Sequence, residues 1–498
     1  MKDHLQAYVL ICGAGAAGLT LAVDLARRGV SFRLIEKMPG PFAGSRGKGI
    51  QPRTLEIFED FGIVDRLAAV GGAYPAERRY LSDGSHTDKR VMEQHPPTPA
   101  EPYQEPLMVP QFLTEGVLRE RLAELGYQPD YGCELVGFEQ DQDGVTVHLR
   151  GAAVEETLRV RWLVGADGGR SFVRHALAIE FPGKTLGVRA IVADVTLDGL
   201  SRDFWHRFNE GDMSKQISFC PLAGTSLFQI QGPVALEGEV DLTVAGLNAM
   251  ITERTGRNDI MVQSVSWASA YGMNARLAQR YRAGSVFLMG DAAHIHPPTG
   301  GQGLNTSVQD AYNLGWKLAA VSSGAPEVLL DSYEEERQPV AAAMLGLSTR
   351  LLEAQKRGEM QRGREVHQLD IGYRESTLAV GTLQRGDYPI AGDRAPDARI
   401  LGAGGQPTRL FNLLCGPHWT LLGYRVDRAA VPARSGLHIH VFGGELLDDQ
   451  GLFREAYGVS DGDWVLVRPD GYIGVIVGND DLDMLERYFK RVGLTCTF

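Results

Sequence analysis

The amino-acid sequence predicts an α/β fold made of more than one domain. Its 498 residues exceed what one ordinary hydrophobic core accommodates. Near the N-terminus an apolar run, a glycine-rich turn and a helix-forming stretch follow one another, and the middle of the chain alternates apolar and polar residues. These patterns indicate a Rossmann-like nucleotide-binding domain combined with an antiparallel-sheet domain.

The first predicted elements are a strand, a turn and a helix. Residues 8–12 form an apolar run, residues 13–18 read G-A-G-A-A-G, and residues 19–28 favour a helix. A second strand over residues 32–35 ends at Glu36, 18 residues after the last glycine of the turn, which completes a βαβ unit. The Glu36 carboxylate is therefore placed to accept hydrogen bonds from ribose hydroxyls.

Each glycine of the turn has a mechanical task in a dinucleotide site. Gly13 permits the tight turn, Gly15 lets the backbone approach a pyrophosphate, and Gly18 lets the helix pack closely on the strand. The diphosphate is expected on the free N–H groups and the positive end of the helix dipole. The turn residues Ala16 and Ala17 therefore belong to the predicted site.

Residues 284–305 favour FAD over NAD as the bound dinucleotide. An apolar strand runs into Gly290-Asp291, and the Asp291 carboxylate can bond a sugar-alcohol chain. A Pro297-Pro298 turn then leads to Gly300, Gly301 and Gly303, which begin a helix predicted through Leu318. The N–H groups and dipole of that helix would stabilise negative charge on the N1/C2=O edge of a reduced isoalloxazine. A plain NAD dehydrogenase has no such need.

With these motifs the chain resembles the class A FAD-dependent monooxygenases of the aromatic hydroxylase type, and is similar to polyketide hydroxylases and rifampicin monooxygenases. The motifs are G-A-G-A-A-G (13–18), E-K (36–37), S-R-G-K-G-I-Q-P-R-T-L-E (45–56), V-P-Q (109–111), G-A-D-G-G-R-S-F-V-R (165–174) and G-D-A-A-H-I-H-P-P-T-G-G-Q-G-L-N (290–305). The resemblance implies tightly bound FAD, transient NADPH or NADH, and hydroxylation of an aromatic, phenolic or polycyclic polyketide-like substrate by O2 through a flavin C4a-hydroperoxide.

The resemblance also implies roles for single residues. The cofactor-binding set is Gly13, Gly15, Ala16, Ala17, Gly18, Glu36, Lys37, Arg46, Gln111, Asp167, Asp291, Pro298, Gly301, Gly303, Leu304 and Asn305. Within it, Glu36 and Lys37 would meet the adenosine half, Arg46 and Gln111 the pyrophosphate and ribityl region, Asp291 the ribityl chain, and Leu304 and Asn305 the flavin ring. Asp167 belongs to a segment that serves both FAD and the nicotinamide. Ala17 departs from the pattern, since many relatives have Thr there, and no catalytic residue is predicted.

The chain is expected to divide into four parts. The FAD-binding domain would be discontinuous, over residues 1–175 and 281–340, with a substrate-binding β-sheet domain over 176–280 that takes up part of 75–110. Linking helices are expected over 341–390, and a long helical stretch is expected over roughly residues 332–378. Residues 391–498 would form a further domain, thioredoxin-like by the resemblance, with strands at 419–423, 438–442 and 464–476 and a helix at 481–492.

The substrate side and the histidines allow weaker inferences. The aromatic side chains proposed to line the pocket are Trp205, Phe208, Phe219, Phe228 and Trp267. The histidines of the H-I-H segment, residues 294–296, favour a role in shaping the loop near the flavin. They do not predict a metal site, because no further ligands of suitable spacing follow.

Composition excludes several classes of partner. A net charge of −12 without a long Lys/Arg run argues against nucleic acid and anionic membranes. Five cysteines without C-x-x-C spacing predict reduced thiols and a cytoplasmic protein. The protein is expected to be a monomer or a homodimer. The alternatives are a flavin-dependent halogenase or reductase on this fold, Baeyer–Villiger-type oxygen insertion, and a non-catalytic flavin-binding regulator. No W-x-W-x-I-P segment of the halogenase type occurs.

Overall fold

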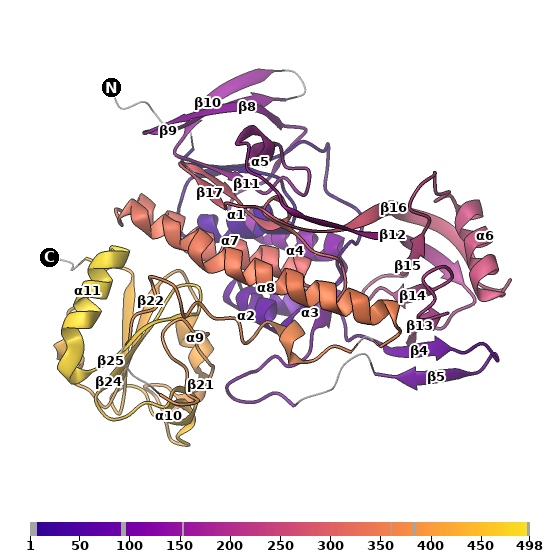
Figure 1. The fold of residues 1–498 in the computed structure, drawn as a ribbon. Coiled ribbons are helices and arrows are strands. Elements are labelled where there is room, and N and C mark those ends of the chain that lie inside the picture. Colours follow the sequence, from indigo (N-terminus) through magenta and orange to yellow (C-terminus); the bar gives the residue numbers. More distant parts are fainter. Residues whose placement is uncertain (1–6, 91–95, 152–153, 360, 382–384, 496–498) are drawn as a thin grey trace.

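The computed structural model describes residues 7–90, 96–151, 154–359, 361–381 and 385–495. Figure 1 shows three regions: a central α/β body, an antiparallel sheet on one side and a small C-terminal domain on the other. Among the described residues, no helix combines the length and the apolar character needed to cross a bilayer. The same residues contain no group of three or more metal-ligand side chains placed to hold an ion.

The central body contains a six-stranded sheet of order β17-β18-β11-β1-β2-β7. Its strands are β1 (Val9–Cys12), β2 (Phe32–Glu36), β7 (Asp130–Tyr131), β11 (Trp162–Gly165), β17 (Arg282–Ala283) and β18 (Val286–Leu288), parallel except for β17. All four residues of β1 are buried, as expected for a central strand covered on both faces. The helices α1 (Ala16–Arg27) and α7 (Gly303–Ser322) pack together beside this sheet.

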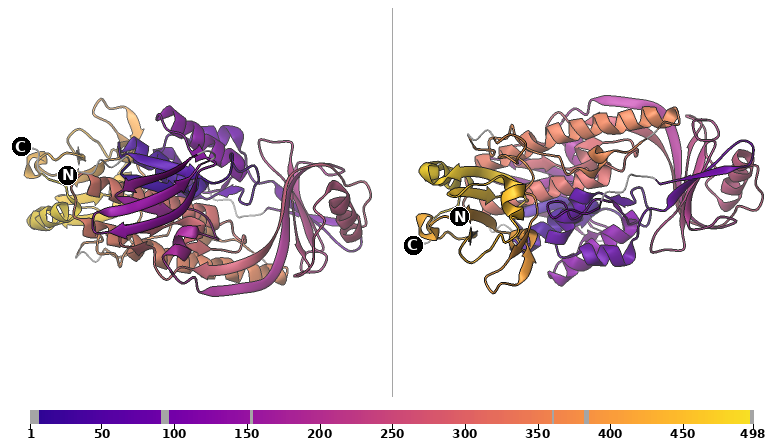
Figure 2. Two further views of the ribbon diagram at one scale, coloured as in Figure 1. Left: turned by 90° about the horizontal axis from the view of Figure 1, so that it is seen from above. Right: turned by 90° about the horizontal axis from the view of Figure 1, so that it is seen from below.

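The second sheet is largely antiparallel and has the order β19-β16-β12-β15-β14-β13-β4-β5. Its strands are β4 (Ala76–Tyr80), β5 (His86–Lys89), β12 (Gly183–Asp198), β13 (Phe204–Phe208), β14 (Ile217–Pro221), β15 (Phe228–Val234), β16 (Met261–Leu277) and β19 (His294–Ile295). The long pair β12 and β16 extends from the central body to the far side of the molecule, where α6 (Val244–Thr255) covers the sheet (Figure 2). Two strands from the N-terminal part of the sequence, β4 and β5, form one edge of this sheet.

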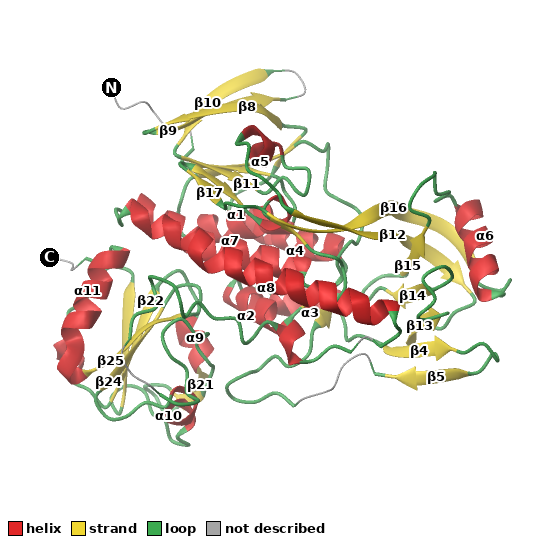
Figure 3. Cartoon of the chain, viewed as in Figure 1, coloured by secondary structure: helices red, strands yellow, loops and turns green. Residues whose placement is uncertain are grey.

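One long helix, α8 (Asp331–Lys356), crosses the body (Figure 3). The expected helical stretch to residue 378 is wrong beyond Lys356. Gly358 has φ +73, a left-handed conformation that an α-helix does not continue through, and only the short turn η3 (Arg364–His367) follows. The segment after α8 therefore turns back toward the central sheets as irregular chain.

The C-terminal domain has a four-stranded sheet of order β23-β22-β24-β25. The strands are β22 (Trp419–Tyr424), β23 (Leu437–Phe442), β24 (Asp463–Val467) and β25 (Ile473–Gly478), and α11 (Leu482–Val492) packs on them. One parallel and two antiparallel pairings followed by a helix agree with a thioredoxin-like arrangement. The expected single strand over 464–476 is in fact two strands, because Gly471 with φ +76 reverses the chain between them.

Candidate functional site

The glycine-rich turn between β1 and α1 has the geometry of a dinucleotide site. Gly13 has φ +107, and a side chain there would collide with the carbonyl oxygen of Ala166. A side chain at Gly18 would collide with the carbonyl oxygen of Gly13. These two glycines therefore perform the tight turn and the close helix packing that were predicted for them.

Gly15 differs from both because the space beside it is open. A Cβ atom at Gly15 would meet nothing closer than Glu115 Oε1, at 3.9 Å. Gly15 is also the N-cap of α1, and no side chain caps that helix. An open space at an uncapped helix N-terminus, next to the positive end of the helix dipole, fits a diphosphate.

The Glu36 carboxylate lies at the end of β2 beside this turn. It accepts hydrogen bonds from the backbone N–H of Ala14 at 2.9 Å and of Met38 at 2.9 Å. These bonds fix the carboxylate where a ribose is expected, and Lys37 beside it is exposed to solvent. Contact of both residues with an adenosine stays a prediction.

Gln111 links the turn to the loop that carries Arg46. Gln111 is the first residue of α4 (Gln111–Glu124). Its side chain accepts a hydrogen bond from the N–H of Gly47 at 3.3 Å and donates one to Glu115 at 2.8 Å. The exposed Arg46 guanidinium stacks over Phe42 at 5.1 Å. Gln111 therefore lies near the open space beside Gly15, through its bond to Glu115, and contact of Arg46 with the pyrophosphate or ribityl chain stays a prediction.

Glu115 belongs to this site and was missed in the sequence. Its carboxyl group is buried, Oε2 has no hydrogen-bond partner, and burial raises its pKa to about 7. Gln111 and Arg119 act in the opposite direction. The signal available in the sequence was its position four residues after Gln111, which places both side chains on one face of α4.

The position of Glu115 predicts that FAD binding depends on pH. Above about pH 7 the carboxyl group should ionise and repel the diphosphate, so we expect the Kd for FAD to rise roughly 10-fold from pH 6 to pH 8. Glu115→Gln should bind FAD equally at both pH values. Fluorescence titration of the apoprotein with FAD gives the Kd of the parent and of the variant at each pH. Equal pH dependence in parent and variant would show that another group is responsible.

Asp291 follows shortly after the buried strand β18. It belongs to the turn η1 (Gly290–Ala292), and its side chain is accessible to solvent. The surrounding protein nevertheless desolvates the carboxyl group and raises its pKa, while His294 and Arg46 act to lower it. An accessible but partly desolvated carboxyl group fits the predicted bond to the ribityl chain.

The N-terminus of α7 is the second uncapped helix end. No side chain caps it, a Cβ atom at Gly303 would meet nothing within 4 Å, and one at Gly301 would lie 3.5 Å from Gln51 Nε2. This open backbone suits the polar edge of a flavin. Leu304 is half-buried beside it and faces Gly47.

The Asn305 side chain connects two loops. It accepts from the N–H of Gln51 at 2.8 Å and donates to the carbonyl oxygens of Gly49 at 2.9 Å and Gly301 at 2.7 Å. Contact of Asn305 with the flavin ring stays a prediction.

Asp167 completes the set from the segment after β11. Its Oδ2 accepts from the N–H of Val173 at 3.1 Å, whereas Oδ1 is buried without a partner. An unpaired buried acceptor beside Gly13 has room for a donor from a ligand. The open glycine-lined spaces, the two uncapped helix ends and this acceptor together fit an FAD molecule.

A buried ionic network supports the Asp291 turn from behind. His294 Nε2 donates to Asp310 Oδ2 at 2.6 Å, and Arg337 Nε donates to Asp310 Oδ1 at 2.8 Å. The N–H of Gly290 also donates to Asp310 Oδ2, at 3.1 Å. Burial alone would raise the pKa of Asp310, but His294 and Arg337 hold it below its usual value. His294 therefore positions the loop.

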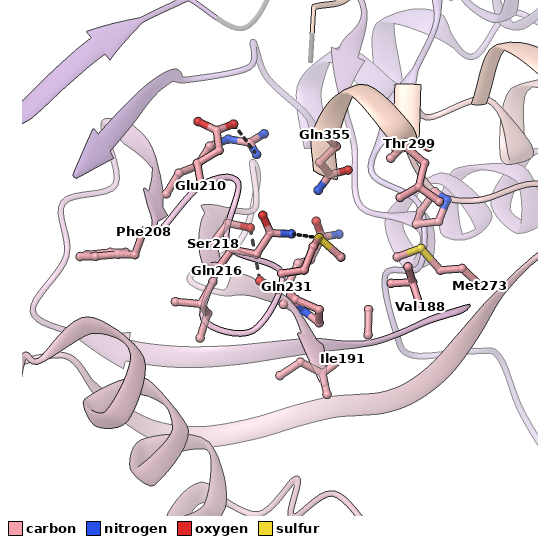
Figure 4. A pocket seen from close by; sticks show the side chains of 18 of the residues that line it. Val188, Ile191, Phe208, Glu210, Gln216, Ser218, Gln231, Met273, Thr299 and Gln355 are labelled. Carbon is pink, nitrogen blue, oxygen red and sulfur yellow. Dashed lines mark hydrogen bonds and ion pairs between the residues drawn. The ribbon is translucent and has the colours of Figure 1, made fainter. Parts of the chain in front are cut away.

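A pocket lies between the second sheet and the end of α8 (Figure 4). Pro298 and Thr299, from the loop before α7, form part of its wall, so the pocket adjoins the place where the flavin ring is expected. Figure 4 places Thr299 and Met273 on one side and Glu210 and Phe208 on the other. The wall combines apolar side chains with a few polar and charged groups, as is usual for a ligand site.

The prediction of the lining aromatics is only partly right. Trp205 and Phe208 line the pocket. Phe219 and Phe228 lie in the core beneath α6, and Trp267 packs edge-on against Phe42 with ring centroids 5.3 Å apart. The alternation of a strand shows that two faces exist but does not show which one faces a cavity.

Comparison with known proteins gives two family matches. Residues 6–348 match the model described as FAD binding domain, and residues 437–496 match the one described as phenol hydroxylase, C-terminal dimerisation domain. A flavin-dependent monooxygenase of Mycobacteroides abscessus is 42% identical over 487 residues, which cover 96% of this chain and 99% of the relative.

Two further relatives extend the comparison. A rifampicin monooxygenase of Streptomyces venezuelae is 38% identical over 341 residues, covering 68% of this chain and 69% of the relative. The crystal structure of a ternary complex of aklavinone-11 hydroxylase with FAD and aklavinone superposes with a TM-score of 0.85 at 28% identity. That superposition covers 99% of both chains.

Proposed function

Because this chain belongs to the family of FAD-dependent monooxygenases, we propose that it uses NADPH or NADH and O2 to hydroxylate a polycyclic phenolic substrate. The observation that carries the choice of substrate is the pocket beside Pro298, at the expected flavin edge, whose wall combines aromatic and aliphatic side chains with a few polar groups. Relatives named for rifampicin and aklavinone support a fused-ring substrate.

Different residues of the chain would contribute to different parts of the reaction. Bound FAD supplies electron transfer from the nicotinamide and activation of O2. The N-terminus of α7 would stabilise negative charge at the polar edge of the reduced ring, and Asp291 would hold the ribityl chain. The apolar wall of the pocket, which includes Ile191, Ile217 and Met273, would exclude water from the reacting centre.

A single dinucleotide turn supports a reductant that binds briefly. The glycine-rich segment at residues 402–405 connects β20 (Arg399–Leu401) and β21 (Pro407–Arg409) in a hairpin, so it leads into a strand and not into a helix. A lasting second nucleotide domain would need its own βαβ turn. The nicotinamide would therefore reach the flavin through the same cleft that holds FAD. Asp167 is one candidate contact for it there.

Assembly and location are parts of the same proposal. The match of residues 437–496 to a dimerisation domain supports a homodimer rather than a monomer. A cytoplasmic location would supply reduced nicotinamide and keep the thiols reduced. The thiol of Cys415 has a pKa raised by burial to about 11, which supports a structural rather than a redox role for it.

Oxidation of NADPH by the holoenzyme tests the reaction. We expect a polycyclic phenol to accelerate oxidation at least ~10-fold, about 1.4 kcal/mol in barrier, because coupling reduction to substrate arrival avoids wasted turnover. Mass spectrometry under 18O2 should find one labelled oxygen in the product. Label from water, or only H2O2 with every phenol, would contradict the proposal. Added halide and ketone substrates separate halogenation and Baeyer–Villiger insertion from hydroxylation.

A further inference from the structure

Three cationic side chains surround one indole ring at the end of the substrate pocket. Lys48 Nζ lies 4.5 Å from the Trp205 ring centroid, Arg207 Cζ 4.3 Å and Arg362 Cζ 6.0 Å. Trp205, Arg207 and Arg362 line the pocket, and Lys48 lies buried behind them. Trp205 and Arg207 are two residues apart on β13, so their side chains share a face. These three cations are called the cationic cluster below.

Too few carboxylates compensate the cationic cluster. Glu77 pairs with Arg207 at 2.6 Å and with Arg79 at 2.8 Å, and Glu210 pairs with Arg79 at 3.0 Å and lies 3.9 Å from Arg207. Four cations, Arg79 included, therefore share two carboxylates. In the described part of the chain Arg362 forms no ion pair and its Nε has no hydrogen-bond partner, so the charge of Glu77, which it shares with Arg207 and Arg79, is the one carboxylate charge that raises its pKa.

The remaining neighbours add little negative charge. Lys48 donates at 2.5 Å to the neutral Oε1 of Gln229. The carboxylate of Asp194, whose charge also acts on Lys48, accepts bonds from the N–H and the hydroxyl of Ser45. Burial raises the pKa of the Cys220 thiol and that of the Tyr74 hydroxyl, so both stay neutral at neutral pH.

Unpaired donors lie at the same end of the pocket. Arg362 Nε, Arg207 Nε and Trp205 Nε1 are buried and have no hydrogen-bond acceptor. Trp205 and Arg207 are each more than nine-tenths buried. Native proteins rarely leave several buried donors unpaired in one place, unless a ligand or ordered water supplies the acceptor.

The chain as a whole carries a net charge of −12, so this local excess of positive charge is not a general property of its surface. Cations in a cleft with low-dielectric walls attract anions strongly. Guanidinium groups also match the geometry of oxyanions. The surplus charge and the unpaired donors point to the same kind of ligand group.

We propose that the cationic cluster binds an anionic oxygen of the substrate, with Arg362 as the residue that selects it. The anionic oxygen is a carboxylate or an ionised phenol or enol on the fused-ring system. Arg207 lies 3.9 Å from Glu210, which is across the pocket from Thr299 (Figure 4), so this contact would hold the substrate on the Glu210 side. The inference rests on the proposed function and narrows its substrate class.

Binding to the oxidised holoenzyme tests the inference without turnover. The ligands are two matched pairs: 4,5-dihydroxyanthraquinone-2-carboxylate with its methyl ester, and 1,8-dihydroxyanthraquinone with its dimethyl ether. Flavin fluorescence gives each Kd between pH 6 and pH 9. The proteins are the parent, Arg362→Met, Arg362→Lys and a control, Arg350→Met, which removes an exposed arginine of α8 outside the pocket.

We expect the anionic member of at least one pair to bind at least ~10-fold more tightly than its neutral partner, as for a charge-assisted hydrogen bond. Arg362→Met should abolish this preference, Arg362→Lys should keep part of it, and Arg350→Met should keep all of it. A carboxylate preference should not vary with pH. A phenolate preference should grow as pH rises through the pKa of the ligand.

Three results would overturn the inference: equal binding within both pairs, a preference that survives Arg362→Met, or no binding of any ligand to the FAD-saturated parent. NADPH oxidation measured with the same ligands separates this failure from failure of the proposed function. Stimulation by the neutral members alone would leave the monooxygenase proposal intact and remove the anionic subsite. Full FAD content and an unchanged circular dichroism spectrum would show that Arg362→Met is folded.

Discussion

Gly15→Val is expected to yield a folded protein that purifies largely without flavin. The backbone at Gly15 has φ −77, which any residue adopts, and a Cβ atom there has 3.9 Å of clearance from the nearest protein atom. The valine side chain would therefore fit the protein but fill the space expected for the pyrophosphate. Overlap of this kind costs about 1–3 kcal/mol, which corresponds to a ~10- to 100-fold weaker Kd for FAD.

The absorbance ratio of flavin to protein after purification measures this effect, and FAD titration of the apoprotein gives the Kd. Gly15→Ala is a milder substitution at the same position and should lose less of the bound flavin. Gly18→Val is the contrasting control: its side chain would collide with the carbonyl oxygen of Gly13, so the fold itself should fail. Full flavin occupancy in Gly15→Val would show that the pyrophosphate does not bind at this turn.

Asp310→Ala is expected to lower the free energy of unfolding by about 3–5 kcal/mol, the usual cost of breaking a buried ion pair by removing one partner. The substitution leaves Arg337 and His294 fully buried without their carboxylate. It also frees the N–H of Gly290, so the turn that carries Asp291 should loosen and FAD should bind more weakly.

Urea unfolding of the apoprotein at pH 7 separates the stability effect from cofactor binding. Glu353→Ala is the matched control, because that carboxylate pairs with Lys356 on the exposed face of α8 and should contribute less than about 1 kcal/mol. Asp310→Asn should lie between the two. A loss in Asp310→Ala no larger than in Glu353→Ala would show that the network does not support the loop.

The parts of the site that the sequence predicts are those encoded by local spacing. The turn over residues 13–18 and the acid at Glu36 follow from short-range order, because a βαβ unit fixes all of them within 24 residues. The motif over residues 290–305 is likewise contiguous, and the structure places its glycines at the N-terminus of α7. Local motifs of this kind need no knowledge of tertiary packing.

The parts that the sequence does not predict depend on contacts between distant segments. Asp310 and Arg337 lie on different helices, and their pairing is visible only once α7 and α8 are packed. Arg362 was expected on a helix through residue 378, whereas it follows the left-handed Gly358 and returns to the pocket. Phe219 and Trp205 lie on strands whose pocket-facing side depends on the register of the whole sheet.

The order of segments in the central sheet has a consequence for the synthesis of the protein. β1 pairs with β11, which pairs with β18, so the turn at Gly15 and the helix end at Gly303 meet only after the whole second sheet has been made. A nascent chain that ends before β18 lacks half of the flavin cleft. The vitamin-derived cofactor therefore cannot guide the first steps of folding on the ribosome, and can act only on a nearly finished chain.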